Sequence, residues 1–262
     1  MSPAADQDAE SAAGLVSEEQ VRQLITAEGR RIALPGVLNL RDLGGYPAAG
    51  GSRLRWRTLL RSDALHQLDQ ADLARLALRT VVDLRTELES DYAPSPLAGL
   101  PARLNHVSLI GSDFPAEPLE LGGIYRFLIA ERGSAIAEAI RPLCEDGAFP
   151  ALVHCSAGKD RTGIVIALIL AVAGVPDEVI AADYAYSSVC LDPDLTPAIG
   201  QLRASTGLDE DRTRELLSCP PYLILDVLAE VRAASGTVEG YLAEHGLTAA
   251  ELSALRAALI AD

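Results

Sequence analysis

The chain is short of positive charge. It has 22 lysines and arginines against 37 aspartates and glutamates, which gives a formal net charge of −15 at pH 7. A protein with this charge repels polyanions, so a nucleic-acid partner is not expected. Any phosphate group that it binds must be met by positive charge gathered at one place.

Cysteine and histidine are scarce as well. The four cysteines include no C-x-x-C pair, which disfavours a disulfide scaffold and favours a reducing compartment. The histidines are scattered through the chain, so no metal site is expected, and no other pattern points to a cofactor. They are His66, His106, His154 and His245.

The sequence also lacks the usual signals for export or membrane insertion. The amino-terminal residues include no basic stretch followed by an apolar core. The most apolar run, from Ile164 to Val175, is too short to span a bilayer, which takes about 20 residues. We therefore expect a cytoplasmic protein without stable membrane insertion, while secretion without a signal peptide stays open.

The composition fits one folded domain. The chain has 262 residues, of which 49% are hydrophobic, and this suffices for one full core. Residues 1–20 are acidic and contain no lysine or arginine. We therefore expect a disordered tail over 1–20 and a single domain over 21–262.

Strand-like and helix-like runs alternate up to residue 176. This order predicts an α/β domain with a mostly parallel central sheet flanked by helices. The expected strands cover 31–34, 39–43, 57–61, 80–84, 104–109 and 152–154. The expected helices cover 69–78, 122–144 and 162–175, with Gly133 and Pro142 as weak points in the second.

Beyond residue 176 the pattern is helical only. The expected helices cover 176–189, 196–204, 209–217, 221–234, 238–244 and 249–260. The region at about 190–235 is interrupted by prolines and a glycine. A lid over a site, an oligomer interface and ordinary core packing all fit it, and the oligomeric state stays open.

The most informative pattern lies in residues 149–163, FPALVHCSAGKDRTG. Cys155 and Arg161 have the spacing C-x5-R, with a strand-like run before them and a helix-like run after them. None of the other three cysteines has an arginine at that distance. A strand–loop–helix turn presents several backbone N–H groups to an anion, and Gly158 permits a tight loop. A buried structural cysteine is the plainer alternative.

These residues suit attack by a cysteine thiolate on a phosphate monoester. Cys155 is the candidate nucleophile and forms a cysteinyl-phosphate, which water then cleaves. Arg161 offers paired N–H donors to two phosphate oxygens. The candidate phosphate-binding residues are Ser156, Ala157, Gly158, Lys159, Arg161 and Thr162. Thr162 is expected either to donate to the sulfur or merely to begin the helix. Asp160 follows Lys159 where a Walker-type nucleotide loop needs serine or threonine, which excludes that loop.

Four further segments surround the loop in the chain: Asn39–Tyr46 (NLRDLGGY), Arg61–Leu65 (RSDAL), Asp83–Glu89 (DLRTELE) and Asp183–Ser187 (DYAYS). With the loop sequence HCSAGKDRTG, they resemble an atypical bacterial tyrosine phosphatase family whose loop has the form HCxxGKDRTG. The resemblance covers about residues 30–190. It implies a cysteine-phosphatase fold with a helical lid, and activity on phosphotyrosine, phosphoserine or phosphothreonine and often on phosphoinositides.

The resemblance also implies a general acid. The only tryptophan, Trp56, is followed by arginine, so the Trp-Pro-Asp loop that carries the acid in many cysteine phosphatases is absent. In the family, the acid is the aspartate inside the loop, which here is Asp160; a helix cap or an ion pair is the alternative. A basic residue at the position of Lys159 is linked in similar proteins to doubly phosphorylated or inositol substrates. Ordinary attraction of phosphate is the alternative for Lys159.

Other motif residues are expected to support the loop. Asp83, at a strand end, is expected to orient Arg161 through an ion pair or to be an alternative acid; a plain surface charge fits equally well. Arg41 and Asp42 fit a buried network beneath the loop. His154 is expected to shape the loop by hydrogen bonding rather than to transfer protons.

The sequence therefore predicts a cysteine-dependent phosphomonoester hydrolase, in the first place a protein tyrosine phosphatase of dual or lipid specificity. The alternatives are a phosphatase for nucleotide or sugar phosphates in a biosynthetic pathway and a phosphate-binding protein without turnover. The expected partner is a phosphorylated protein, a phosphoinositide or a small phosphate monoester. Capture of an oxidised Cys155 by Cys144 or Cys190 stays open.

Overall fold

The computed structural model describes residues 17–111, 114, 120–191, 204, 207 and 209–261. Within these residues, one sheet is formed by β1 (Arg41–Asp42), β2 (Leu59–Ser62), β3 (Thr80–Asp83), β4 (Arg103–His106) and β5 (Ala151–His154). The strands lie in the order β1-β2-β5-β3-β4. β1 runs antiparallel to β2, and the other neighbours are parallel. The predicted α/β class with a mostly parallel sheet is confirmed.

Each central strand is buried on both faces, and its apolar side chains alternate between two cores. Leu60 of β2, Leu152 of β5 and Val81 of β3 lie side by side in register and belong to one hydrophobic cluster. Their neighbours Val153 and Val82 belong to a second, larger cluster on the opposite face. This alternation explains why the strands are continuous apolar runs in the sequence.

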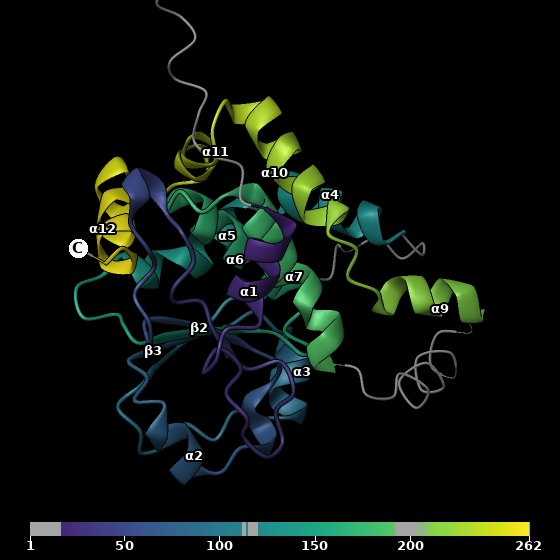
Figure 1. The fold of residues 1–262 in the computed structure, drawn as a ribbon. Helices are drawn as coiled ribbons and strands as arrows, with labels where there is room; N and C mark the ends of the chain where they lie inside the picture. The colour runs from purple at the N-terminus through teal and green to yellow at the C-terminus, as the bar shows by residue number, and fades with distance from the viewer. Residues whose placement is uncertain are drawn as a thin grey trace, which may run out of the picture.

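The larger cluster is covered by helices from the second half of the chain (Figure 1). They are α4 (Leu121–Glu131), α5 (Gly133–Ile140), α6 (Asp160–Val172), α7 (Asp177–Leu191), α10 (Tyr222–Ser235), α11 (Val238–Glu244) and α12 (Ala249–Leu259). α6 is apolar on almost every side because it lies between the sheet and the other helices. The break between α4 and α5 falls where Gly133 was expected to weaken a single helix. A Cβ on Gly133 would lie 2.2 Å from the ring of His245, so the close contact requires glycine.

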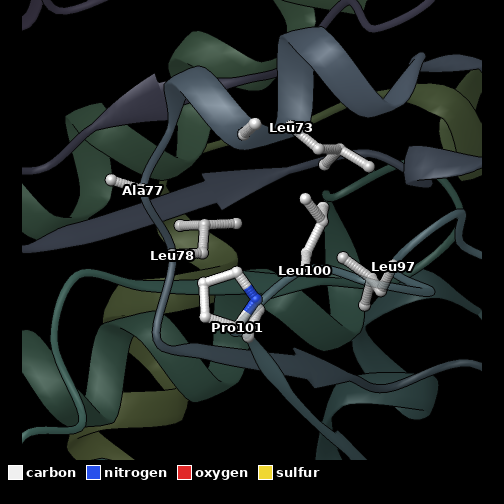
Figure 2. Close-up of a pocket in the computed structure, with 8 residues that line it drawn as sticks. Leu73, Ala77, Leu78, Leu97, Leu100 and Pro101 are labelled. Atoms are coloured by element: carbon white, nitrogen blue, oxygen red, sulfur yellow. The ribbon is translucent and has the colours of Figure 1, made fainter.

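The smaller cluster lies under α2 (Gln70–Arg75) on the other face of the sheet. Figure 2 shows the residues of α2 and of the segment 97–102 that line an apolar pocket there. The volume of this pocket is about 70 Å³. Leucines dominate its lining, namely Leu73, Leu78, Leu97 and Leu100. None of the predicted site residues lines this pocket, and its lining carries no titratable side chain. It is therefore a packing defect of the smaller core, separate from the chemistry discussed below.

Two local features differ from the sequence-based expectation. Residues 31–34 form only an isolated bridge, Arg31 with Arg41, because the chain turns at Gly36 instead of continuing as a strand. A short helix that was not expected, α3 (Glu87–Tyr92), follows β3 and begins with a capping box made by Thr86 and Glu89. The capping signal is present in the sequence, but six residues are too few to show a helical period.

The structure also tests the expectations for the amino-terminal tail and for the region after residue 190. α1 (Glu18–Ile25) begins with Ser17 as its cap, so residues 18–20 of the expected tail are helical, while residues 1–16 lie outside the described part. Of the residues in the helix expected over 196–204, only residue 204 belongs to the described part of the chain. The next expected helix is confirmed by α9 (Glu210–Leu217). Within the described residues, no helix combines the length and the apolarity needed to cross a membrane.

The parallel strands bring their carboxyl ends to one edge of the sheet. Ser62, His154 and Asp83 lie side by side there, since Ser62 pairs with His154 and His154 pairs with Asp83 in register. Loops at this edge are where open α/β sheets bind ligands. Cys155 follows directly after His154, so the predicted loop begins at this edge.

Candidate functional site

The loop that joins β5 to α6 has the predicted strand–loop–helix geometry. Cys155 comes directly after β5, and Asp160 is the first residue of α6. Cys155 is only 2% exposed, so its thiol lies at the bottom of the loop. Lys159 stands at the cap position of α6 and supplies no side-chain cap to the first N–H groups of the helix. These N–H groups therefore remain available to an anion.

Three consecutive carbonyl groups of the loop are held by residues outside it. The carbonyl oxygen of Ser156 accepts from the backbone N–H of Ala64 at 3.0 Å. The Asn39 side-chain amide donates to the carbonyl oxygens of Ala157 at 2.9 Å and Gly158 at 3.1 Å. In a trans peptide the N–H points opposite to the C=O. The N–H groups of residues 157–159 consequently point away from Ala64 and Asn39, toward the inner side of the loop.

Gly158 makes this arrangement possible. Its φ of 66° lies in the left-handed region, and a Cβ there would stand 2.2 Å from the carbonyl oxygen of Ser62. Both the conformation and the contact with the end of β2 exclude a larger residue. The close approach to Ser62 lets the loop lie against the sheet edge.

A buried ion-pair network lies beneath the loop. Asp183 of α7 binds Arg41 (Nε to Oδ1, 2.9 Å) and Arg61 (Nη1 to Oδ2, 2.6 Å). The Tyr46 hydroxyl donates to the same carboxylate at 2.9 Å. Although burial would raise the pKa of Asp183, the two guanidinium groups hold it well below its usual range. Arg61 also donates to the carbonyl oxygen of Gly158 at 2.7 Å, so the network reaches the loop directly.

This network accounts for two of the motifs. The expected buried role of Arg41 is found, and Arg61 from the RSDAL segment belongs to the same network. Asp42 is also buried, but it accepts from the backbone N–H groups of Gly44 and Arg57 and so fixes the turn after β1. Asn39, whose role the spacing did not reveal, proves to hold the loop.

Arg161 is paired with Glu89 of α3. Its Nη1 and Nη2 lie 2.6 and 2.9 Å from the two carboxylate oxygens, and the Ser156 hydroxyl donates to one of them. Burial would lower the pKa of Arg161, but Glu89 and the neighbouring Cys155 raise it above its usual value. The guanidinium is therefore always charged and is fixed in one orientation. Glu89 is the last residue of the DLRTELE segment, and the spacing of the motifs does not reveal that it pairs with Arg161.

Asp83 lies in a different set of contacts. Its carboxylate binds the neighbouring Arg85 through both oxygens, with the shortest distance 2.6 Å, and it lies 3.7 Å from Nε2 of His154. The carboxylate that orients Arg161 is thus Glu89 rather than Asp83. His154 lies between Asp83 and the loop, and its Nδ1 donates to the carbonyl oxygen of Cys155 at 3.2 Å.

Asp160 and Lys159 point to the helical side of the loop. The Tyr125 hydroxyl of α4 donates to Oδ1 of Asp160 at 2.8 Å, and Nζ of Lys159 lies 3.2 Å from the same oxygen. The Lys159 ammonium also donates to the carbonyl oxygens of Leu216 at 2.6 Å and Ser218 at 3.0 Å. Lys159 is only 3% exposed, so in this state it binds the end of α9 instead of facing an open cleft.

Thr162 is placed directly after Arg161 on α6. Its hydroxyl is fully buried and has no hydrogen-bond partner among the described residues. The expected donation to the sulfur is therefore not formed in this state. A buried hydroxyl without a partner is uncommon, and it leaves a donor available inside the site.

Taken together, the loop offers three convergent elements. They are the buried thiol of Cys155, the backbone N–H groups on the inner side of the loop, and the Arg161 guanidinium, which Glu89 holds in place. Oriented backbone dipoles of this kind hold a tetrahedral oxyanion and stabilise a thiolate. A carboxyl group, Asp160, lies at the rim with a third of its side chain exposed. The arrangement suits nucleophilic displacement at phosphorus with an acid close by.

The chain is similar in sequence to known phosphatases. A model described as "Tyrosine phosphatase family" matches residues 32–261. The chain is 27% identical over 276 residues to the triple specificity protein phosphatase PtpB of Mycobacterium tuberculosis, covering 87% of this chain and 98% of that protein. It is 30% identical over 234 residues to a tyrosine-protein phosphatase of Nostoc commune, covering 81% and 78%. Among solved structures, P. aeruginosa TpbA is similar over 84% of this chain and 99% of that chain, with 22% identity and a TM-score of 0.32.

His154 predicts a measurable pH dependence of stability. Burial lowers the pKa of His154 to about 4, against 6.5 for an ordinary histidine, and the nearby Asp83 offsets only part of this. Below pH 6.5 His154 becomes protonated in the unfolded chain, whereas in the folded chain it stays neutral down to about pH 4. The free energy of unfolding therefore decreases as the pH falls from 6.5 to 4. We expect a loss of roughly 2 kcal/mol between pH 7 and pH 5 in urea unfolding.

The same titration in a His154→Gln variant should lack this slope, although the variant is less stable at pH 7. His66→Gln is the matched control, because His66 is exposed, and it should keep the slope of the wild type. An unchanged slope in His154→Gln would contradict the assignment.

Proposed function

Since the family match covers most of the chain, this protein belongs to the tyrosine phosphatase family, and we propose that it hydrolyses phosphate monoesters through a phosphocysteine. The observation that carries the proposal is the loop whose carbonyl groups are held outward around Cys155. Because these carbonyl groups bind residues outside the loop, the backbone N–H groups on its inner side are available to bind a phosphate group. The proposed reaction has two steps, formation of the phosphocysteine and its hydrolysis.

In the first step, the Cys155 thiolate attacks phosphorus while the bond from phosphorus to the leaving oxygen breaks. The inward N–H groups and Arg161 bind the equatorial oxygens, on which negative charge is spread in the transition state. Asp160 supplies the proton that the leaving oxygen takes up. The products are the free alcohol or phenol, a cysteinyl-phosphate and an ionised Asp160.

In the second step, a water molecule attacks the phosphocysteine. Asp160 accepts the proton of the water, the sulfur–phosphorus bond breaks, and inorganic phosphate leaves. The electron pair of that bond returns to sulfur as thiolate. Donation from the Thr162 hydroxyl, which has no partner among the described residues, would stabilise this thiolate.

The proposed substrate is a phosphorylated protein with phosphotyrosine in the first place. The names of the two relatives support this: one is a tyrosine-protein phosphatase and the other a triple specificity protein phosphatase. In the described state Lys159 is engaged by the end of α9, so it adds no free cation for a second phosphate group. Inositol or doubly phosphorylated substrates would need Lys159 to leave these carbonyls. The reducing, cytoplasmic setting expected from the cysteines remains a proposal.

The contacts of Lys159 support a covering role for the C-terminal helices. The carbonyl groups that it binds lie at the end of α9 and just before α10, within the region expected to be a lid. This link joins that region to the phosphate loop itself. A cover at this place excludes water and shields the thiolate from oxidation.

Replacing the nucleophile tests the reaction. Cys155→Ser should lower turnover of p-nitrophenyl phosphate by more than roughly 10³-fold, because a serine hydroxyl is not ionised at neutral pH. Binding of tungstate, measured by calorimetry, should persist because the N–H groups and Arg161 remain. Cys144→Ser is the control, and it should keep full turnover. Retained activity in Cys155→Ser would exclude the phosphocysteine route.

Leaving-group dependence tests the acid. Asp160→Ala should slow phenyl phosphate by about 10²-fold or more and slow p-nitrophenyl phosphate far less, because a good leaving group needs no proton. Asp83→Asn is the matched comparison for the alternative acid. If the leaving-group dependence appears in Asp83→Asn and not in Asp160→Ala, the acid role passes to Asp83.

A further inference from the structure

Tyr125 is a buried residue outside the loop that joins β5 to α6. It is on α4, only 1% exposed, and its hydroxyl oxygen contacts the loop. That oxygen lies 2.8 Å from Oδ1 of Asp160 and 2.7 Å from the hydroxyl oxygen of Tyr184. The family motifs described above do not include α4, so no sequence pattern draws attention to Tyr125.

The direction of both hydrogen bonds follows from the number of protons. A tyrosine hydroxyl carries one proton, and an ionised carboxylate can only accept. The Tyr125 proton therefore points to Asp160, and Tyr184 must donate its own proton to the oxygen of Tyr125. The three groups form a chain that runs from Tyr184 through Tyr125 to Asp160, in which each bond polarises the next.

Both hydroxyl groups keep their protons under working conditions. Burial, together with the charge of Asp160, raises the pKa of Tyr125 well above its usual value, and burial raises that of Tyr184 as well. The hydrogen-bond chain from Tyr184 through Tyr125 therefore always ends in a hydroxyl donor that is directed at Asp160.

The position of Tyr184 is fixed by a glycine of the loop motif. A Cβ on Gly163 would lie 2.8 Å from the ring of Tyr184, so only glycine lets this ring approach α6 so closely. The rings of Tyr184 and Tyr125 then meet edge to face, with centroids 6.1 Å apart. The tyrosine pair is thus built into the packing of α4, α6 and α7.

Asp160 is held by one oxygen only. Oδ1 accepts from Tyr125 and lies near the Lys159 ammonium, whereas Oδ2 has no hydrogen-bond partner among the described residues. We infer that Tyr125 is a positioning residue for Asp160, which holds Oδ1 as an acceptor and so leaves Oδ2 to carry the proton given to the leaving group. The inference rests on the proposed function, because it presumes that Asp160 is the acid.

The test is a double-mutant cycle with two substrates. Tyr125→Phe removes one oxygen and keeps the ring. It should slow phenyl phosphate about tenfold, and p-nitrophenyl phosphate by less than about threefold. In the Asp160→Ala background, Tyr125→Phe should have no further effect on phenyl phosphate, because the residue acts only through Asp160.

The pH profile gives an independent measure. A hydroxyl that donates to a carboxylate favours its ionised form, so its loss in Tyr125→Phe should move the alkaline limb of kcat/KM to higher pH. A merely structural effect lowers the profile without moving the limb.

Tyr241→Phe is the matched control. Its hydroxyl is also buried and donates to a backbone carbonyl of α4, that of Ile129, at 2.7 Å. It should lower thermal stability about as much as Tyr125→Phe and leave both substrates and the pH profile unchanged. Tyr184→Phe keeps the bond from Tyr125 to Asp160, so it should give a smaller change of the same kind.

Two results would overturn the inference. One is equal slowing of both substrates by Tyr125→Phe, and the other is an undiminished effect of Tyr125→Phe in the Asp160→Ala background. In either case the wild-type enzyme still hydrolyses both esters, so the proposed function stands. Absence of hydrolysis in the wild type would instead overturn the proposed function, and this inference with it.

Discussion

The ion pairs of Asp183 are the interaction on which the site depends. One carboxylate holds Arg41 and Arg61 in the interior, where burying charge is costly unless it is paired and hydrogen-bonded. Arg61 then uses another N–H to hold the carbonyl of Gly158. A residue of α7 thereby fixes the backbone of a loop that precedes it in the chain. Removing Asp183 would leave both arginines buried without their counter-charge, so the network favours one loop conformation.

The proposed binding of phosphate by the loop uses little excess of positive charge. Arg161 is matched by Glu89, and Lys159 lies beside Asp160. The attraction must then come largely from N–H dipoles that point inward, together with the one guanidinium. Because dipoles act over short distances, they are effective in a chain whose net charge is −15. Both carboxyl groups lie next to the loop, Glu89 paired with Arg161 and Asp160 beside Lys159.

Sequence reasoning succeeded where the signal is local. The buried strands β3 and β5, the glycine at residue 158 and the start of α6 follow from short apolar runs and turn chemistry within a few residues. It did not find α3, which is too short to show a period, and it assigned Lys159 to the substrate side. The carbonyls that bind Lys159 lie 57 and 59 residues further along the chain, and nothing in the spacing indicates that they meet it.

By itself the sequence determined the chemistry. Cys155 directly follows β5 and Arg161 lies in the first turn of α6, so their relative position depends mainly on the local backbone geometry of one short strand–loop–helix turn. The tertiary structure decided what surrounds them. Glu89 reaches Arg161 from α3, and Tyr125 reaches Asp160 from α4. Such contacts depend on how separate elements pack against α6, and packing is set by the whole core rather than by the spacing of any motif.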